Sequence, residues 1–331
     1  MFTRLQRAAR YLNPQTWRST VVRVDLLADS TQRLRAQVDE LLVRTEQLET
    51  AARLDWEMQD EIARLDARLE LDLPRIDAHV RRAVAKAQLD LNPFPHIVVD
   101  HWLPSDVYQL MLGALPPAVF FADRDVSRQR MVVPFGKGPI YSRRVWDFVS
   151  KHIVGVMLHD VLALKFDSVI KDFLSSACSE LEGLDWQMHT SDGRIMLRRP
   201  GYVIAPHRDP KWGFVTGLIY LARPGDNESF GTQLYRVRGD EEAPNDKPYY
   251  VDESRCELVR SVPFKANSML AFLNSGGAHG ASIPAHAKPA DLERYVYQFR
   301  LGPDRQGIKQ MLAQMNEERR ELWSGGKRRT G

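Results

Sequence analysis

Residues 202–209, with the sequence YVIAPHRD, carry the strongest fold signal in this chain. The first half of this stretch is apolar and contains β-branched residues, which is typical of a β-strand. Residues two apart in a strand point to the same side of the sheet, so His207 and Asp209 should share a face. An imidazole and a carboxylate held on one face are two of the ligands that a metal site requires.

Five further segments with the character of strands or close turns follow downstream. They are residues 215–221, 231–235, 267–272, 276–280 and 294–299. The fourth holds His279 among glycines, and glycine removes side chains where the backbone must approach a metal or ligand closely. The last begins with Arg294 and should place Gln298 on the same face as this arginine.

Together, His207, Asp209 and His279 suggest one particular chemistry. Two imidazoles and one carboxylate can hold Fe(II) on one side of its coordination sphere, leaving positions open for a chelating cosubstrate and for O2. Arg294 then offers a planar fork for the far carboxylate of that cosubstrate. The set favours an oxygen-using hydroxylase over a hydrolase or a scaffold.

In this order, the motifs resemble the prolyl-4-hydroxylase-like branch of the Fe(II)/2-oxoglutarate dioxygenases. The matching motifs are His207-x-Asp209, Gly231-x-x-Leu234, Asn267-Ser268-x-Leu270-x-Phe272, His279-Gly280 and Arg294-Tyr295. Residues 92–104, NPFPHIVVDHWLP, are similar to the first strand and helix start of that branch. The resemblance covers residues 91–303, and as a set the motifs are more specific than any one of them.

The resemblance implies an α+β fold whose catalytic domain is a double-stranded β-helix, or jelly roll. It implies His207, Asp209 and His279 as iron ligands and Arg294 as the residue that binds 2-oxoglutarate. Thr216 and Tyr220 fall where relatives place hydroxyl groups around this cosubstrate. Fe(II) and 2-oxoglutarate are thus the expected cofactor and cosubstrate, with ascorbate as a third candidate. The spacing of 15 positions between His279 and Arg294 is longer than in the shortest members, and leaves Arg300 as the alternative arginine.

The long segment before this domain predicts helix. We divide the chain into four parts: a basic amphipathic segment (residues 1–19), a helical segment that is expected to form a coiled coil (20–90), the dioxygenase domain (91–303) and a basic C-terminal helix and tail (304–331). Apolar or small residues recur at alternating steps of four and three, namely Leu34, Val38, Leu41, Thr45, Leu48 and Ala52. This spacing favours a homo-oligomer joined through the helix, the alternative being a helical hairpin packed on the enzyme. Pro74 is expected to end the long helix, so that truncation there should leave an active domain.

Composition limits the other classes. The 331 residues are 44% hydrophobic, with no uninterrupted apolar run of about 18 residues. Cys178 and Cys256 are the only cysteines, which favours a reducing compartment, and a cytoplasmic location is expected. There is no apolar secretory leader at the start. The basic ends allow a weak peripheral membrane contact as a minor interpretation.

Three functions remain open at this point. The first is hydroxylation of an unactivated C–H bond in a protein prolyl residue, an amino acid or a small metabolite. The second is a nucleic-acid dealkylase of the same superfamily, suggested by Arg294 and Arg300 but disfavoured because no aromatic-rich basic lid is visible. The third is a non-catalytic coiled-coil interaction protein with a degenerate β-helix. Loops 121–142 and 238–255, with Trp212, Tyr235, Arg236, Tyr249 and Tyr250, are candidates to shape the substrate pocket.

Overall fold

The structure is a computed structural model in which residues 14–122, 131–132, 136, 138–177, 187–239, 251–289, 291–317 and 320 are described. Three of the segments discussed above lie wholly or partly outside these residues. They are the basic segment 1–19, of which residues 1–13 are not described, most of both pocket loops, and the tail from residue 321. The chain divides into two compact units, Met1–Leu54 and Asp55–Gly331. The unit boundary therefore lies well before the domain start at residue 91 that we expected.

Helix α2 (Pro14–Glu57) makes up the described part of the first unit and extends into the start of the second. It contains no Gly or Pro after its first residue, so nothing in the sequence interrupts it. One residue, Met58, separates it from α3 (Gln59–Lys86). None of the described helices combines the length and the hydropathy that a membrane-spanning segment needs.

The expectation that Pro74 ends the helix is wrong, because α3 continues through it. A proline inside a helix removes one hydrogen bond and costs about 3 kcal/mol. Burial offsets that cost here: Leu65 and Leu69 before the proline, and Ile76, Val80 and Val84 after it, all join the main hydrophobic core. Truncation at Pro74 would remove part of this core, so Leu54 is the appropriate place to separate the helix from the second unit.

Two antiparallel sheets form the centre of the second unit. The seven-stranded sheet has the order β1-β9-β6-β11-β4-β3-β2, and the four-stranded sheet has the order β5-β10-β7-β8. Their bounds are β1 His96–Asp100, β2 Phe121–Ala122, β3 Met131–Val132, β4 Met188–Arg198, β5 Val203–His207, β6 Val215–Tyr220, β7 Thr232–Val237, β8 Cys256–Val262, β9 Ser268–Leu273, β10 Ala278–Ser282 and β11 Arg294–Pro303. From β4 onward the chain passes repeatedly from one sheet to the other. This winding is that of a jelly roll, and the antiparallel fold expected from the sequence is confirmed.

The space between the sheets is filled by side chains from both. Leu218, Leu270 and Val296 of the large sheet meet Leu234 and Val262 of the small sheet in one buried cluster. These positions fix the inner face of each strand, since residues two apart share a side. On β6 the inner face therefore carries Thr216, Leu218 and Tyr220. On β11 it carries Arg294, Val296 and Gln298.

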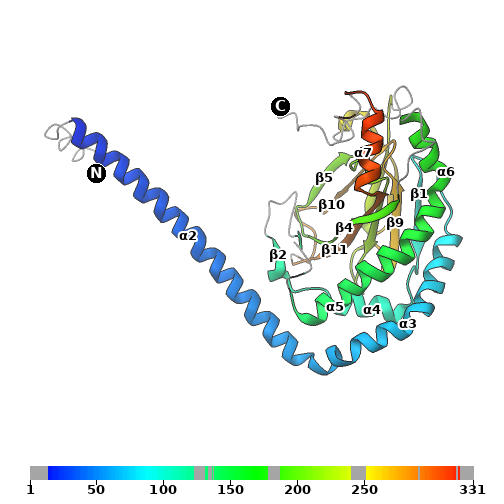
Figure 1. The fold of residues 1–331 in the computed structure, drawn as a ribbon, viewed down its shortest axis with the longest axis horizontal. Coiled ribbons are helices and arrows are strands. Elements are labelled where there is room, and N and C mark those ends of the chain that lie inside the picture. The colour runs from blue at the N-terminus through cyan, green and yellow to red at the C-terminus, as the bar shows by residue number, and fades with distance from the viewer. Residues whose placement is uncertain are drawn as a thin grey trace. The chain divides into compact units, whose positions relative to one another are not determined.

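Helices cover the outer face of the large sheet. They are α4 (Ser105–Gly113), α5 (Ile140–Phe148), the π-helix η3 (Val149–Leu158) and α6 (His159–Ala177), together with α3. Figure 1 shows α3, α5 and α6 along one side of the strands. Their apolar faces share a core with outward residues of the sheet such as Ile195, Ile219 and Tyr297. Short 3-10 turns at Ala118–Phe120, Glu228–Phe230 and Glu253–Arg255 lie in the connections, and α7 (Arg305–Gln314) follows β11.

Candidate metal centre

The structure brings His207, Asp209 and His279 together at one end of the inner face. One potential ligand atom from each lies within 4.8 Å of those of the other two, and all three side chains are buried. The register of the small sheet explains the meeting, because His279 on β10 pairs directly with His207 on β5. The two imidazole rings are 4.2 Å apart. Asp209 lies two residues beyond His207, just after the end of β5.

The protein holds two of the potential ligands, His207 and Asp209, in a defined orientation. The Nδ1 atom of His207 lies 2.9 Å from the backbone carbonyl of Ala205, which can only accept a hydrogen bond. Nδ1 therefore carries the proton and Nε2 keeps its lone pair for a metal. Asp209 is held at both oxygens: Thr216 Oγ1 donates to Oδ2 at 2.6 Å, and Arg300 Nη2 lies 3.2 Å from Oδ1.

Electrostatics favour the metal-binding forms of Asp209 and His279. Burial by itself would raise the pKa of the Asp209 carboxyl, but nearby Arg300, His279 and His207 outweigh it and hold the pKa well below its usual range. Burial lowers the pKa of His279 to about 3, so this imidazole is neutral near pH 7. A carboxylate and neutral imidazoles are the forms that bind a cation without first releasing a proton.

The structure gives Thr216 a different neighbour from the one we expected. Its hydroxyl donates to Asp209, and the Asn274 side-chain nitrogen lies 3.0 Å from the same oxygen. Thr216 therefore orients a potential metal ligand, and its proton is not free for a cosubstrate. Asn274 was missed by the sequence reasoning. It continues the inward alternation of Leu270 and Phe272, so strand periodicity could have identified it.

Arg294 lies on the inner face at the other end of the strand from the triad. Its side chain is buried, with the guanidinium carbon 4.9 Å from the centre of the Phe264 ring and 5.7 Å from that of Tyr220. No acidic side chain of the described residues forms an ion pair with it, and its Nε has no hydrogen-bond partner. Burial lowers its pKa, which means that the charged form is held at a cost.

Tyr220 lies beside this arginine, and its role at a cosubstrate site stays a prediction. Its hydroxyl lies 2.8 Å from Thr232 Oγ1, and burial raises its pKa to about 12, so it remains protonated. Arg294, Tyr220 and Thr232 thus gather one guanidinium and two hydroxyls around the inner end of the barrel. This is the kind of donor set that binds a carboxylate.

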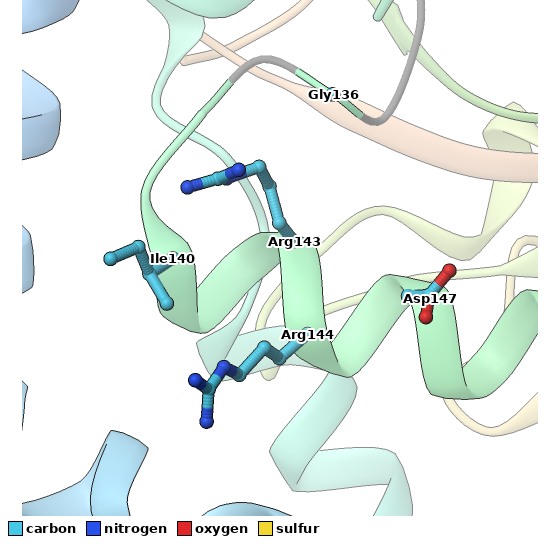
Figure 2. Close-up of a pocket in the computed structure, with 5 residues that line it drawn as sticks. All are labelled: Gly136, Ile140, Arg143, Arg144 and Asp147. Carbon is cyan, nitrogen blue, oxygen red and sulfur yellow. The ribbon is translucent and has the colours of Figure 1, made fainter.

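Other candidates do not join the site. Arg236 makes contacts at the surface, with Glu257 at 3.1 Å and Asn92 at 2.8 Å. Tyr235 donates its hydroxyl proton to Gln233. Tyr249 and Tyr250 lie outside the described residues. A hollow of about 530 Å³ lies elsewhere, on α5, lined by Gly136, Ile140, Arg143, Arg144 and Asp147 (Figure 2), and none of its residues belongs to the metal centre.

Comparisons with known proteins give matches among solved structures alone. No protein-family model matches the chain, and no curated protein matches it in sequence. Among solved structures, a prolyl-4-hydroxylase from Pseudomonas putida matches with 16% identity over 67% of this chain and 98% of its own, at a TM-score of 0.36. A prolyl hydroxylase from Trichoplax adhaerens, solved with a hypoxia inducible factor peptide, has 14% identity over 76% and 96%, at 0.37. HygX from Streptomyces hygroscopicus, solved with nickel, 2-oxoglutarate and hygromycin B, has 16% identity over 63% and 83%, at 0.37.

Proposed function

We propose that this protein is an Fe(II)- and 2-oxoglutarate-dependent dioxygenase that hydroxylates an unactivated C–H bond. The observation that carries the proposal is the content of the barrel interior. One end gathers two imidazoles and an ionised carboxylate, and the other end holds a buried arginine with which no described acidic side chain pairs. A metal ion would bind the three ligand atoms at the first end, and a carboxylate would balance the charge of Arg294 at the second.

The donor set fits ferrous iron. Two nitrogens and one oxygen that approach from one side are the ligands of non-haem Fe(II) oxygenases, and they leave other positions open. A structural zinc site would instead be expected to have four protein ligands. Among the described residues, only these three side chains form a cluster that could hold a metal ion.

The inner end fits the far carboxylate of 2-oxoglutarate. The Arg294 guanidinium can donate two parallel hydrogen bonds to a carboxylate, which a lysine cannot do. The aromatic rings of Tyr220 and Phe264 surround it and exclude water, and this strengthens the ion pair with a bound anion. Arg300 is the less suitable candidate, because Asp209 already lies beside its guanidinium.

When bound together, iron and 2-oxoglutarate supply the oxidation of a C–H bond by O2, with release of succinate and CO2. The protein's own residues prepare that chemistry. The hydrogen bond from His207 to Ala205 fixes the tautomer of the ring, and Thr216 and Arg300 hold the two oxygens of Asp209. The apolar cluster between the sheets keeps water from the reacting groups.

The substrate class we propose is a protein prolyl residue, a free amino acid or a small metabolite. The dealkylase alternative rested on the spacing of Arg294 and Arg300, which echoes the paired arginines of that group, and on the basic ends of the chain. Because Arg300 is engaged by Asp209, that pair loses one member. The non-catalytic alternative predicts no iron binding, which the following experiment tests directly.

The test is an anaerobic Fe(II) titration followed by measurement of 2-oxoglutarate-dependent succinate formation under O2. We expect one iron per chain and turnover that is uncoupled until a suitable substrate is added. His279→Ala should lose both activities, whereas His286→Ala, which changes an exposed histidine, should keep both. Equal iron binding by the two variants would exclude His279 as a ligand, and no iron binding by the wild-type protein would refute the proposal.

A further inference from the structure

Helix α2 carries a continuous apolar seam whose leucines are exposed in the described part of the chain. Leu27, Leu34, Leu41 and Leu48 recur every seven residues, and each is more than 60% exposed. The buried leucines of α3 show that the fold does cover such a stripe where it packs against the enzyme. An apolar stripe of this length in water is expected to find a partner helix.

The residues of the seam specify the kind of partner. With the four leucines at the d positions of a heptad, the a positions are Val24, Thr31, Val38 and Thr45, followed by Ala52. Four consecutive a positions are thus β-branched, and every d position from 27 to 48 is leucine. In parallel coiled coils this combination favours two strands over three or four.

The two threonines fit a buried seam because their hydroxyls are satisfied within the helix. Thr31 Oγ1 donates to the carbonyl of Leu27 at 2.7 Å, and Thr45 Oγ1 donates to the carbonyl of Leu41 at 2.9 Å. Each hydroxyl can therefore enter an apolar interface without losing its hydrogen bond. Toward the partner, a threonine then presents its methyl group.

Charges flanking the seam fit a second copy in the same direction. In a parallel dimer, the residue before an a position faces the residue five further along on the partner. Arg44 would then face Glu49 of the other helix, and the two-fold symmetry repeats the pair. The other such pairs in the seam, Arg23 with Ala28, Ser30 with Arg35, and Gln37 with Leu42, contain no like charges.

We propose that α2 binds a second copy of this chain as a parallel, in-register, two-stranded coiled coil over residues 24–52. The seam is complementary to itself, since each leucine meets its own copy and Arg44 meets Glu49 twice. The assembly carries two enzyme units, one on each helix. The seam extends over about 40 Å at 1.5 Å per residue, enough for four heptads of contact.

The first experiment compares a seam variant with a matched surface variant in the full-length protein. Leu34→Lys/Leu41→Lys places four charges in the interface, and should raise the dissociation constant of the dimer roughly a hundredfold or more. Leu26→Lys/Val43→Lys changes residues that are similarly exposed in the single chain, at 61% and 49%, but lie off the seam. Sedimentation equilibrium should give twice the chain mass for the wild type and the surface variant, and the chain mass for the seam variant. A monomeric wild type, or equal dissociation constants for the two variants, would overturn the proposal.

Two further variants test the direction of the helices. Arg44→Glu should weaken the dimer by about two- to tenfold, and adding Glu49→Arg should restore it, because exposed ion pairs contribute modestly. In a background with Cys178→Ser and Cys256→Ser, Leu48→Cys should form a disulfide between copies on mild oxidation, since equivalent d residues are adjacent only in a parallel register. A dimer that gives neither charge rescue nor cross-linking would be antiparallel, contrary to the proposal.

Discussion

Arg294 and Arg300 are two buried arginines of the same strand, but they have different neighbours. Both lie on the inner face of β11, and both are more than 90% buried. Arg300 has the carboxylate of Asp209 at 3.2 Å, whereas Arg294 is surrounded by the rings of Phe264 and Tyr220, and no acidic side chain in the described part of the chain pairs with it. A buried charge must be balanced, so the metal end of the barrel supplies its own anion and the inner end requires one from outside.

The two ends of the space between the sheets therefore have different tasks: the metal end, near Asp209, would hold a cation, and the inner end, near Arg294, would hold an anion. At the metal end, Arg300 and Thr216 hold the Asp209 carboxylate in place for a metal ion. At the inner end, the arginine is held by apolar contacts alone, which position its guanidinium without neutralising it. The following experiments ask whether this division is correct, and they run from the largest expected effect to the smallest.

Asp209→Ala should abolish iron binding and should also destabilise the protein. It leaves Arg300 buried without its carboxylate, and breaking a buried pair costs about 3 kcal/mol or more of unfolding free energy. Adding Arg300→Met should restore most of the stability while iron binding remains lost. Urea unfolding and anaerobic iron titration measure the two effects, and a double variant as unstable as Asp209→Ala would mean that Arg300 is not balanced by this carboxylate.

Arg294→Ala should raise the concentration of 2-oxoglutarate needed for half-maximal turnover by about a hundredfold, with iron affinity unchanged. Arg294→Lys should have a smaller effect of the same kind, since it keeps the charge and loses the bidentate fork. Steady-state succinate formation gives the values. Arg300→Lys is the control, and if it raises the 2-oxoglutarate requirement while Arg294→Lys does not, the roles of the two arginines are reversed.

The metal-free protein should lose stability on acidification because of the metal end. Burial lowers the pKa of His279 to about 3, whereas the unfolded chain titrates near the ordinary value of about 6.5. Between these values the unfolded state binds a proton that the folded state does not, so the free energy of unfolding falls as the pH is lowered, by about 2 kcal/mol from pH 7 to pH 5. His279→Phe should remove this part of the pH dependence in urea unfolding. His286→Phe should leave it unchanged, and an equal slope in both variants would contradict the assignment.

Substitutions at two threonines test whether the metal end and the inner end are separate sites, and their expected effects are the smallest. Thr216→Val removes the hydrogen bond to Asp209 and should weaken iron binding about tenfold, as loss of a group that orients a ligand does. Thr232→Val removes the partner of Tyr220 at the other end and should leave iron affinity unchanged while weakening 2-oxoglutarate binding. Iron and 2-oxoglutarate titrations on both variants should show this crossed pattern. If both variants affect the same ligand, the two ends are not separate sites.

Local periodicity was sufficient for much of the site. The alternation in residues 202–209 placed His207 and Asp209 on one face, and the same alternation placed Arg294 and Gln298 together on β11. These inferences needed only the geometry of a single strand. Periodicity could not reveal that Thr216 holds Asp209, because that contact joins β6 of one sheet to the end of β5 in the other.

Helices α2 and α3 also show that the periodicity of the sequence does not specify tertiary contacts. Both carry apolar residues at helical spacing, and Pro74 was the clearest breaking signal in the segment. Packing of Leu69 and Ile76 on either side of the proline nevertheless keeps α3 continuous. The seam of α2 remains exposed in the single chain, so its coiled coil stays a prediction that depends on a second molecule.

By itself, the sequence determined the positions of β5, β6, β7, β9, β10 and β11, the spacing of His207 and Asp209 and the presence of two arginines on one face of β11, because these depend on interactions within one element. The tertiary structure alone decided that His279 pairs with His207, that Asp209 balances Arg300, and that Arg294 is left among aromatic rings. Those contacts join residues distant in the chain. They are fixed by strand register and by burial, which the order of residue types along one strand does not specify.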